Sequence, residues 1–229
     1  MTQENFSSIK TYYEELYNEQ KDNSFPYDYP WTTFALDLFK KPSSSAPKSL
    51  DIGCGVGYAC KMLGDRGYES HGIDISEVAL VDARQKFPEG HFHLAHESGK
   101  MDFADETFDV ITCFGVLEHI VNPEDVVAES FRTLKKDGQA LYVVPNTYSP
   151  YFLFTSGTGQ LYEIPRTKKE WLTMFDKAGF KCVHIDKDPG PTILKKFPLI
   201  KKIKLVLNKI LNWGPVDITY QFFFILEKK

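Results

Sequence analysis

Blocks of apolar residues alternate with amphipathic segments along the chain from residue 48 onward. The amphipathic or capped segments predict helices after a glycine-rich turn at 53–57, at Ser76, at Pro123 and at Lys168. Strands alternating with helices of this length predict a mostly parallel sheet with helices on both faces. The expected strands lie at 49–52, 68–73, 91–95, 108–113, 139–144, 180–185 and 219–226, and the fourth of them is mostly apolar, as a central parallel strand is.

Capping residues sharpen several helix boundaries. Ser76 is a good N-cap, and Asn122-Pro123 combines a cap residue with proline at the first helical position. We expect the second of these helices to end near 135–138. The pattern at Thr167–Glu170 is a capping box, and Gly179 is expected to end the helix that it opens.

The chain divides into an N-terminal extension, residues 1–47, and one α/β domain, residues 48–229. Helical spacing over 9–17 and a second short helix over 31–40 are expected in the extension. The length of 229 residues and the 42% of hydrophobic residues suit a single domain. The net charge of −4 argues against a nucleic-acid partner.

One late segment departs from this acidic average. Residues 189–216 contain six lysines and no acidic residue, and apolar side chains over 195–211 fall mainly on one helical face. Two interpretations stay open: a helix packed on the sheet edge, or a peripheral contact with a membrane surface.

The chain lacks the marks of a secreted or disulfide-bonded protein. Its first ten residues lack the basic-then-apolar profile of a signal peptide, and no apolar run approaches the roughly 20 residues of a membrane span. The four cysteines form no C-x-x-C pair. We therefore expect reduced thiols and a cytoplasmic location.

The glycine-rich turn is the first candidate for chemistry. A strand that runs into Gly53, Gly55 and Gly57 and then a helix brings backbone N–H groups to the edge where ligands bind parallel sheets. Asp74, about 20 residues on, suits a ribose hydroxyl. Tyr58, however, stands where a dinucleotide motif has its third glycine.

Asp51 decides between the ligands that this turn suits. A carboxylate in the first strand opposes a pyrophosphate and favours an ammonium group. A ligand with adenine, ribose and an amino-acid end has that charge pattern.

At this point the chain resembles the class I S-adenosylmethionine-dependent methyltransferases, in particular the type 11 small-molecule group related to ubiquinone and menaquinone biosynthesis enzymes. The resemblance covers about residues 48–146 and more faintly 163–185. It rests on five segments in the family's order and spacing: LDIGCGVGY at 50–58, GIDIS at 72–76, MDFADETFD at 101–109, GVLEH at 115–119 and LKKDG at 134–138.

The resemblance implies a Rossmann-like, doubly wound sheet of seven strands in the order 3-2-1-4-5-7-6, with the last strand antiparallel. It implies S-adenosyl-L-methionine as cofactor and S-adenosyl-L-homocysteine as product. Asp51 is expected to hold the methionine end, Asp74 the ribose and Glu97 the adenine, where the family has aspartate. The full set of expected cofactor contacts is Asp51, Gly53, Cys54, Gly55, Tyr58, Asp74, Ile75, Glu97, Ser98, Cys113 and Phe114.

Histidines supply the candidates for acid–base chemistry and for metal ligation. His119 is the candidate catalytic base, and the competing interpretation is that Glu118 and His119 only orient their loop. Some relatives bind a metal through E-x-x-E-H, but Gly115 replaces the first acid here, so no metal is expected. For His91, His93 and His96 a solvated strand edge is favoured over a metal cluster.

The sequence therefore predicts methyl transfer to an O, N or C nucleophile of a small-molecule or lipid-like acceptor. Two alternatives remain: a catalytically silent module that binds the cofactor, and a nucleotide-dependent oxidoreductase. N-terminal helices act as lids in this family, so residues 1–47, with a cluster at Tyr12, Tyr13, Tyr27 and Trp31, are expected to form a cap or lid, with core packing as the other interpretation. The oligomeric state is not predicted.

Overall fold

A computed structural model describes residues 3–19, 35–150, 161–187 and 215–229. Seven strands form one sheet in the order β3-β2-β1-β4-β5-β7-β6, which confirms the predicted order. The first five strands in this order, β3-β2-β1-β4-β5, are parallel to one another, and β7 is antiparallel to both β5 and β6. Their bounds are β1 Lys48–Ile52, β2 Glu69–Asp74, β3 His91–Leu94, β4 Phe108–Phe114, β5 Leu134–Pro145, β6 Phe180–Lys187 and β7 Gln221–Lys228.

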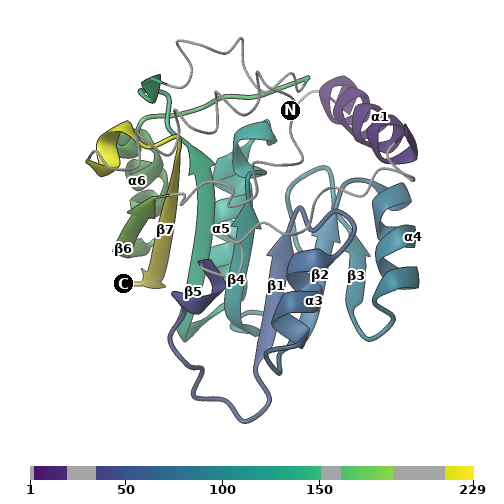
Figure 1. The fold of residues 1–229 in the computed structure, drawn as a ribbon, viewed down its shortest axis with the longest axis horizontal. Coiled ribbons are helices and arrows are strands. Elements are labelled where there is room, and N and C mark those ends of the chain that lie inside the picture. The colour runs from purple at the N-terminus through teal and green to yellow at the C-terminus, as the bar shows by residue number, and fades with distance from the viewer. Residues whose placement is uncertain (1–2, 20–34, 151–160, 188–214) are drawn as a thin grey trace, which may run out of the picture.

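Helices cover both faces of the sheet (Figure 1). One face packs against α5 and α6 through Val127 and Trp171, and the other packs against α3 and α4 through Leu63 and Leu80. In Figure 1, α1 lies beside α4, above the upper ends of β2 and β3. The bounds are α1 Gln3–Glu19, α3 Tyr58–Gly64, α4 Glu77–Lys86, α5 Pro123–Thr133, α6 Lys168–Lys177, and the 3-10 helices η1 Leu117–His119 and η3 Val216–Ile218.

The core lies along the centre of the sheet, and β7 contributes to both of its halves. Phe222 and Phe224 point into the layer with α5 and α6, whereas Phe223 points to the opposite side, and all three are fully buried. This follows from the period-2 alternation of a strand. Continuous apolar sequence is therefore what a central strand with two covered faces requires.

Two of the predicted caps are present in detail. The Ser76 hydroxyl accepts a hydrogen bond from the Ala79 N–H at 3.2 Å. Thr167 and Glu170 form the reciprocal capping box at the start of α6. Gly179 follows this helix with a φ of 103°, a conformation that favours glycine.

The predicted end of α5 was wrong. The helix ends at Thr133 rather than near 135–138, because Leu134 is fully buried and already pairs with Phe108 as the first residue of β5. Strand pairing thus overrides the local helical pattern. The Asn122 side chain also makes no capping hydrogen bond, although Pro123 does begin the helix.

Some predictions lie partly or wholly outside the described residues. Within the expected helix over 31–40, residues 35–37 are helical. The insertion 189–216 and its amphipathic segment 195–211 fall almost entirely outside the description, as do Tyr27 and Trp31. Among the described helices, none is both long enough and apolar enough to cross a bilayer.

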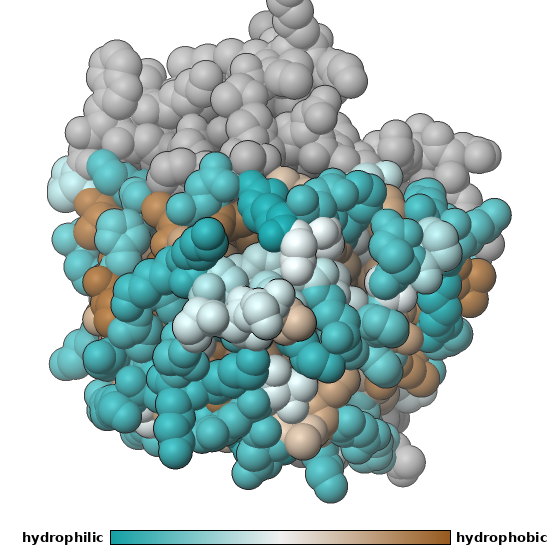
Figure 2. All heavy atoms as spheres, turned by 90° about the horizontal axis from the view of Figure 1, so that it is seen from below, coloured by the Kyte–Doolittle hydropathy of each residue, from teal (hydrophilic) through white to brown (hydrophobic). Residues whose placement is uncertain are grey.

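The parallel strands run from the bottom to the top of Figure 1, so their carboxyl ends lie together at the top. The opposite end of the molecule is mostly hydrophilic in the view from below, with hydrophobic side chains in small separate groups (Figure 2). The predicted site residues are found at the carboxyl ends of the parallel strands.

Candidate functional site

The turn after β1 is a left-handed loop tied to the neighbouring strand. Gly53, Gly55 and Gly57 have φ values of 70°, 51° and 85°. The Gly53 and Cys54 N–H groups both donate to the Ile73 carbonyl, at 2.8 and 3.0 Å. A Cβ on Gly53 would lie 2.4 Å from Val116, so this position admits no side chain.

Asp74 fastens this loop to the start of α4. It ends β2, it is 6% exposed, and its two oxygens accept the N–H groups of Gly55 at 2.8 Å and Ser76 at 2.9 Å. Burial raises the pKa of the carboxyl, and these backbone hydrogen bonds oppose the rise. Each carboxylate oxygen retains a lone pair, so Asp74 can still accept from a ligand hydroxyl.

Asp51 is a second buried carboxyl on the adjacent strand. Its side chain is 3% exposed and accepts the Thr112 hydroxyl at 2.6 Å. Burial, aided by the charge of Asp74 and opposed by the Thr112 hydrogen bond, raises its pKa to about 7. In the described part of the chain, no cation is among the groups that act on this pKa. A cationic ligand nearby would favour the ionised form, so the pocket fits a bound ammonium or sulfonium group.

Glu118 and His119 lie on η1, directly after β4. Both are buried, and Glu118 Oε2 has no hydrogen-bond partner in the described part of the chain. Burial, together with the charge of Glu163, raises the pKa of Glu118 to about 8. Such an atom normally requires a partner, which a ligand hydroxyl or ammonium group can supply.

The protonation of His119 follows from its neighbours. Its Nδ1 lies 2.5 Å from the Tyr162 carbonyl oxygen, and because a carbonyl only accepts, Nδ1 carries the proton. Burial lowers its pKa, so the ring is neutral near pH 7 with a lone pair on Nε2. Nε2 lies 3.7 Å from Glu118 Oε1. His119 can therefore accept a proton on Nε2.

The segment at 162–164 completes this corner of the site. The Ile164 N–H donates to the Glu118 carbonyl at 2.8 Å, and the charge of Glu163 acts on the pKa values of both Glu118 and His119. The sequence analysis did not single out Glu163. Nothing local could have identified it, because its role depends on a contact between segments far apart in the chain.

Helix α1 brings two tyrosines to the same edge. Tyr13 is half-buried, and this partial burial is the main reason that its pKa is raised; the charges of Glu118 and Asp74 add to the rise. The Tyr17 hydroxyl lies 2.6 Å from the position that a Cβ on Gly55 would take. The two residues are one helical turn apart and share a face. Tyr13, but not Tyr17, belonged to the predicted aromatic cluster.

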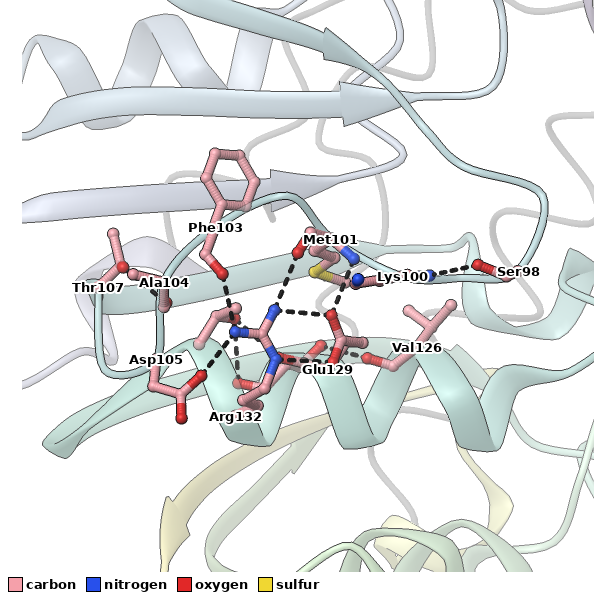
Figure 3. Close-up of polar contacts among 12 residues, drawn as sticks. Ser98, Lys100, Met101, Phe103, Ala104, Asp105, Thr107, Val126, Glu129 and Arg132 are labelled. Carbon is pink, nitrogen blue, oxygen red and sulfur yellow. Dashed lines mark hydrogen bonds and ion pairs between the residues drawn. The ribbon is translucent and has the colours of Figure 1, made fainter.

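The expected adenine contacts follow β3. Glu97 and Ser98 are exposed, and the Ser98 hydroxyl lies 2.7 Å from His96 Nδ1. They share the edge with Asp74, since the Ala95 N–H donates to the Asp74 carbonyl at 2.7 Å. Arg132 on α5 holds the chain that follows them (Figure 3). Its guanidinium donates hydrogen bonds to the carbonyls of Met101 and Phe103 and to the carboxylates of Asp105 and Glu129.

The remaining predicted cofactor contacts lie around this core of the site. Tyr58 begins α3, and its ring meets that of Phe87 edge-on at 5.2 Å. Ile75 is half-buried, and Cys54 is buried. Cys113 is fully buried, so its side chain belongs to the core and only its backbone borders the edge. Phe114 is partly buried against the core clusters near Leu36 and Val143.

Comparison with known proteins bears on this arrangement. Residues 50–142 match the family model described as a methyltransferase domain. A ubiquinone biosynthesis O-methyltransferase from Glaesserella parasuis is 34% identical over 119 residues, which cover 48% of this chain and 50% of that protein. Its counterpart from Photobacterium profundum is 28% identical over 160 residues, covering 60% and 65%.

Residues 50–142 are therefore similar to the methyltransferase domains of the type 11 group, which use S-adenosylmethionine.

Solved structures of methyltransferases share the fold of this domain. A possible histamine N-methyltransferase from Thermotoga maritima has a TM-score of 0.68 at 18% identity, covering 98% of this chain and 100% of its own. A putative methyltransferase solved in a complex with the Haloferax volcanii Trm112 activator has a TM-score of 0.73 at 16% identity, covering 96% and 97%. The chain spans about half the length of most curated relatives it matches.

The buried acid of the methyltransferase domain predicts a pH dependence. Because folded Glu118 binds its proton more tightly than unfolded Glu118, its contribution to stability is present below about pH 4.5 and is lost as the pH rises through about 8. Without ligand, Glu118→Gln should flatten the fall in unfolding free energy between pH 5 and 8 by up to about 1.4 kcal/mol per pH unit. Urea unfolding at several pH values measures this. Exposed Glu89→Gln is the control, and an unchanged slope in Glu118→Gln would contradict the assignment.

Proposed function

We propose that this protein binds S-adenosylmethionine at the carboxyl ends of β1, β2 and β4 and transfers its methyl group to a hydroxyl group of a small-molecule acceptor. One observation carries the proposal: Asp51 and Asp74 are buried beside the left-handed glycine loop, and among the described residues no cation acts on the pKa of either group. That combination suits a nucleoside whose other end is positively charged.

Each residue of the edge has a defined task in binding. Asp74 accepts the ribose hydroxyls, because its carboxylate is already fixed by Gly55 and Ser76. Asp51 balances the positive charge of the methionine end. Glu97, two residues beyond Ala95, whose N–H donates to the Asp74 carbonyl, accepts a hydrogen bond from the adenine amino group. The glycine loop lets Val116 and Tyr17 pack against its backbone at Gly53 and Gly55, where a Cβ would clash, and its left-handed conformation favours glycine.

When bound, S-adenosylmethionine supplies a methyl group activated by its sulfonium. The chain's main contribution is to hold the two reactants in line and to exclude water, which can account for up to roughly 7–11 kcal/mol of the barrier. His119 Nε2 takes the proton of the acceptor hydroxyl as the oxygen forms its bond to the methyl carbon and the carbon–sulfur bond breaks. The Tyr162 carbonyl holds His119 in the tautomer that this step needs.

The acceptor is the least defined part of the proposal. The relatives named above support O-methylation of a small or lipid-like molecule, whereas an N-methyltransferase from Haemonchus contortus, with a TM-score of 0.64 and 19% identity, shows only that the fold also serves amines. A peripheral membrane contact through 195–211 and a cytoplasmic location rest on the sequence alone.

We further propose that α1 acts as a lid over the bound cofactor. Tyr13 is close enough to Asp74 and Glu118 for their charges to affect its pKa, and the Tyr17 hydroxyl lies against Gly55. The face of α1 that carries both tyrosines therefore covers the glycine loop and the acids. A lid of this kind would slow the exchange of the ligand with solvent.

The ribose contact is tested by Asp74→Asn. The variant keeps the shape of the side chain and loses the charge, so S-adenosylhomocysteine should bind at least about tenfold more weakly in calorimetry, which corresponds to about 1.4 kcal/mol. Asp82→Asn on α4 is the control, because Asp82 pairs with Lys86 at the surface. Equal affinity of the Asp74 variant and the parent would refute the ribose role.

The role of His119 is tested separately from binding. His119→Gln should lower kcat for transfer of a radiolabelled methyl group to phenolic hydroxyl acceptors by about 10²–10⁴-fold. Affinity for S-adenosylhomocysteine should stay within about threefold, since His119 faces the acceptor. Unchanged kcat would leave His119 as a residue that only orients the loop. Tight cofactor binding with no acceptor methylated by the parent protein would instead favour a silent binding module.

The lid is tested by dissociation kinetics. Tyr17→Ala removes the ring above Gly55 and should speed dissociation of S-adenosylhomocysteine by about tenfold in a stopped-flow chase. Glu15→Ala, which changes an exposed residue of the same helix, should leave the rate as it is. A Tyr17→Ala variant that releases the ligand no faster would show that α1 packs on the domain without closing the site.

A further inference from the structure

A group of histidines lies on one face of the sheet edge formed by β2 and β3, apart from the site described above. Glu69 and His71 lie two residues apart on β2, and His91 and His93 lie two residues apart on β3. The two strands are parallel, with His71 directly paired to His91. Because residues two apart on a strand share a face, all four side chains project from the same side of the sheet.

The ligand atoms of three of these residues converge. One donor atom each from Glu69, His71 and His91 lies within 4.8 Å of the other two. His71 Nε2 is 3.1 Å from Glu69 Oε1, and the rings of His71 and His91 are stacked with centroids 4.7 Å apart. Ligands at about 2.0–2.2 Å from a tetrahedral Zn²⁺ lie roughly 3.4 Å apart. The exposed side chains of Glu69 and His91 can close that difference by rotation.

His93 lies where a supporting residue would. Its Nε2 is 3.4 Å from His71 Nδ1, on the side of the ring away from Glu69. A histidine that binds a metal through one nitrogen usually donates a hydrogen bond from the other, which fixes its tautomer and orientation.

We propose that Glu69, His71 and His91 bind a divalent transition-metal ion such as Zn²⁺, with His93 as the hydrogen-bond partner of His71. Two imidazoles and one carboxylate are a ligand set that suits Zn²⁺, with the fourth position open to water. In the metal-bound state His71 Nε2 would be the unprotonated ligand atom, and Nδ1 would carry the ring proton and donate it in a hydrogen bond to Nε2 of His93, which then carries its own proton on Nδ1.

One neighbour opposes the ion. The Lys48 ammonium lies 2.8 Å from Glu69 Oε1 and must give up this carboxylate when a cation binds. Both side chains of that pair are partly exposed, so releasing it costs about 0.2–1 kcal/mol. Because Lys48 competes with the ion for Glu69, removing the lysine should strengthen metal binding.

The ion would join the outermost strand to the rest of the sheet. Among the described strands, β3 pairs only with β2; β2 ends at Asp74, and β3 ends three residues before Glu97. A ligand that binds only the folded protein stabilises it. The expected role is therefore to hold the edge of the sheet in place, and it does not depend on methyl transfer.

The test uses the whole chain without an affinity tag, titrated with ZnSO₄ in a calorimeter. We expect one ion per chain and a raised melting temperature. His71→Ala and His91→Ala should each weaken binding more than about 100-fold, and His93→Ala about 10–100-fold. Lys48→Met should tighten it by up to about fivefold. His96→Ala, two residues beyond the end of β3, is the matched control and should bind like the parent.

Three results would overturn the proposal. One is the absence of saturable binding of one zinc ion per chain. Another is equal affinity in His91→Ala, a change at an exposed position that leaves the core untouched. The third is loss of zinc binding in His119→Ala while His71→Ala binds normally, which would place the ion at η1 instead.

Discussion

Two carboxyl groups buried at the ends of adjacent parallel strands are the constraint on which the rest of this structure depends. Asp51 and Asp74 are 3% and 6% exposed, and such burial is costly unless each group has partners. The glycine loop and the first residues of α4 give Asp74 its partners, and Thr112 gives Asp51 one. The backbone geometry of this edge is therefore coupled to the acids that would bind the ligand.

The same constraint separates the candidate functions. A dinucleotide would place a pyrophosphate at the start of α3, where Asp51 adds negative charge and Tyr58 begins the helix in place of the third glycine. A cationic nucleoside gains from the acids instead. The neutral His119, with its lone pair on Nε2, adds a proton acceptor after β4 that a purely binding module would not need.

Two kinds of feature were predictable from the sequence. The order of the sheet followed from the family resemblance. Features set by near neighbours in the chain followed from the residues themselves: the Ser76 cap from a residue type, and the capping box at Thr167 from a spacing of three. The end of α5 was wrong because Leu134 prefers a strand partner that only the folded sheet provides.

Contacts between distant segments could not be predicted from the sequence, because they too depend on partners that only the folded chain brings together. Nothing near Glu163 or Tyr17 indicates that one meets Glu118 and the other Gly55. The histidines show this most clearly. His91 and His93 share a strand face, and the pairing of β2 with β3 adds Glu69 and His71 to it rather than His96. A motif on one strand is visible in sequence, whereas a site shared by two strands requires their register.

We propose that this edge of the sheet binds S-adenosylmethionine, a nucleoside that carries a positive charge, rather than a dinucleotide. Calorimetric titration of the unmodified protein with S-adenosylhomocysteine and with NAD, in the same buffer near pH 7.5, tests it most directly. The account predicts saturable binding of one S-adenosylhomocysteine per chain and no heat of binding with NAD. Binding of NAD without binding of S-adenosylhomocysteine would contradict it.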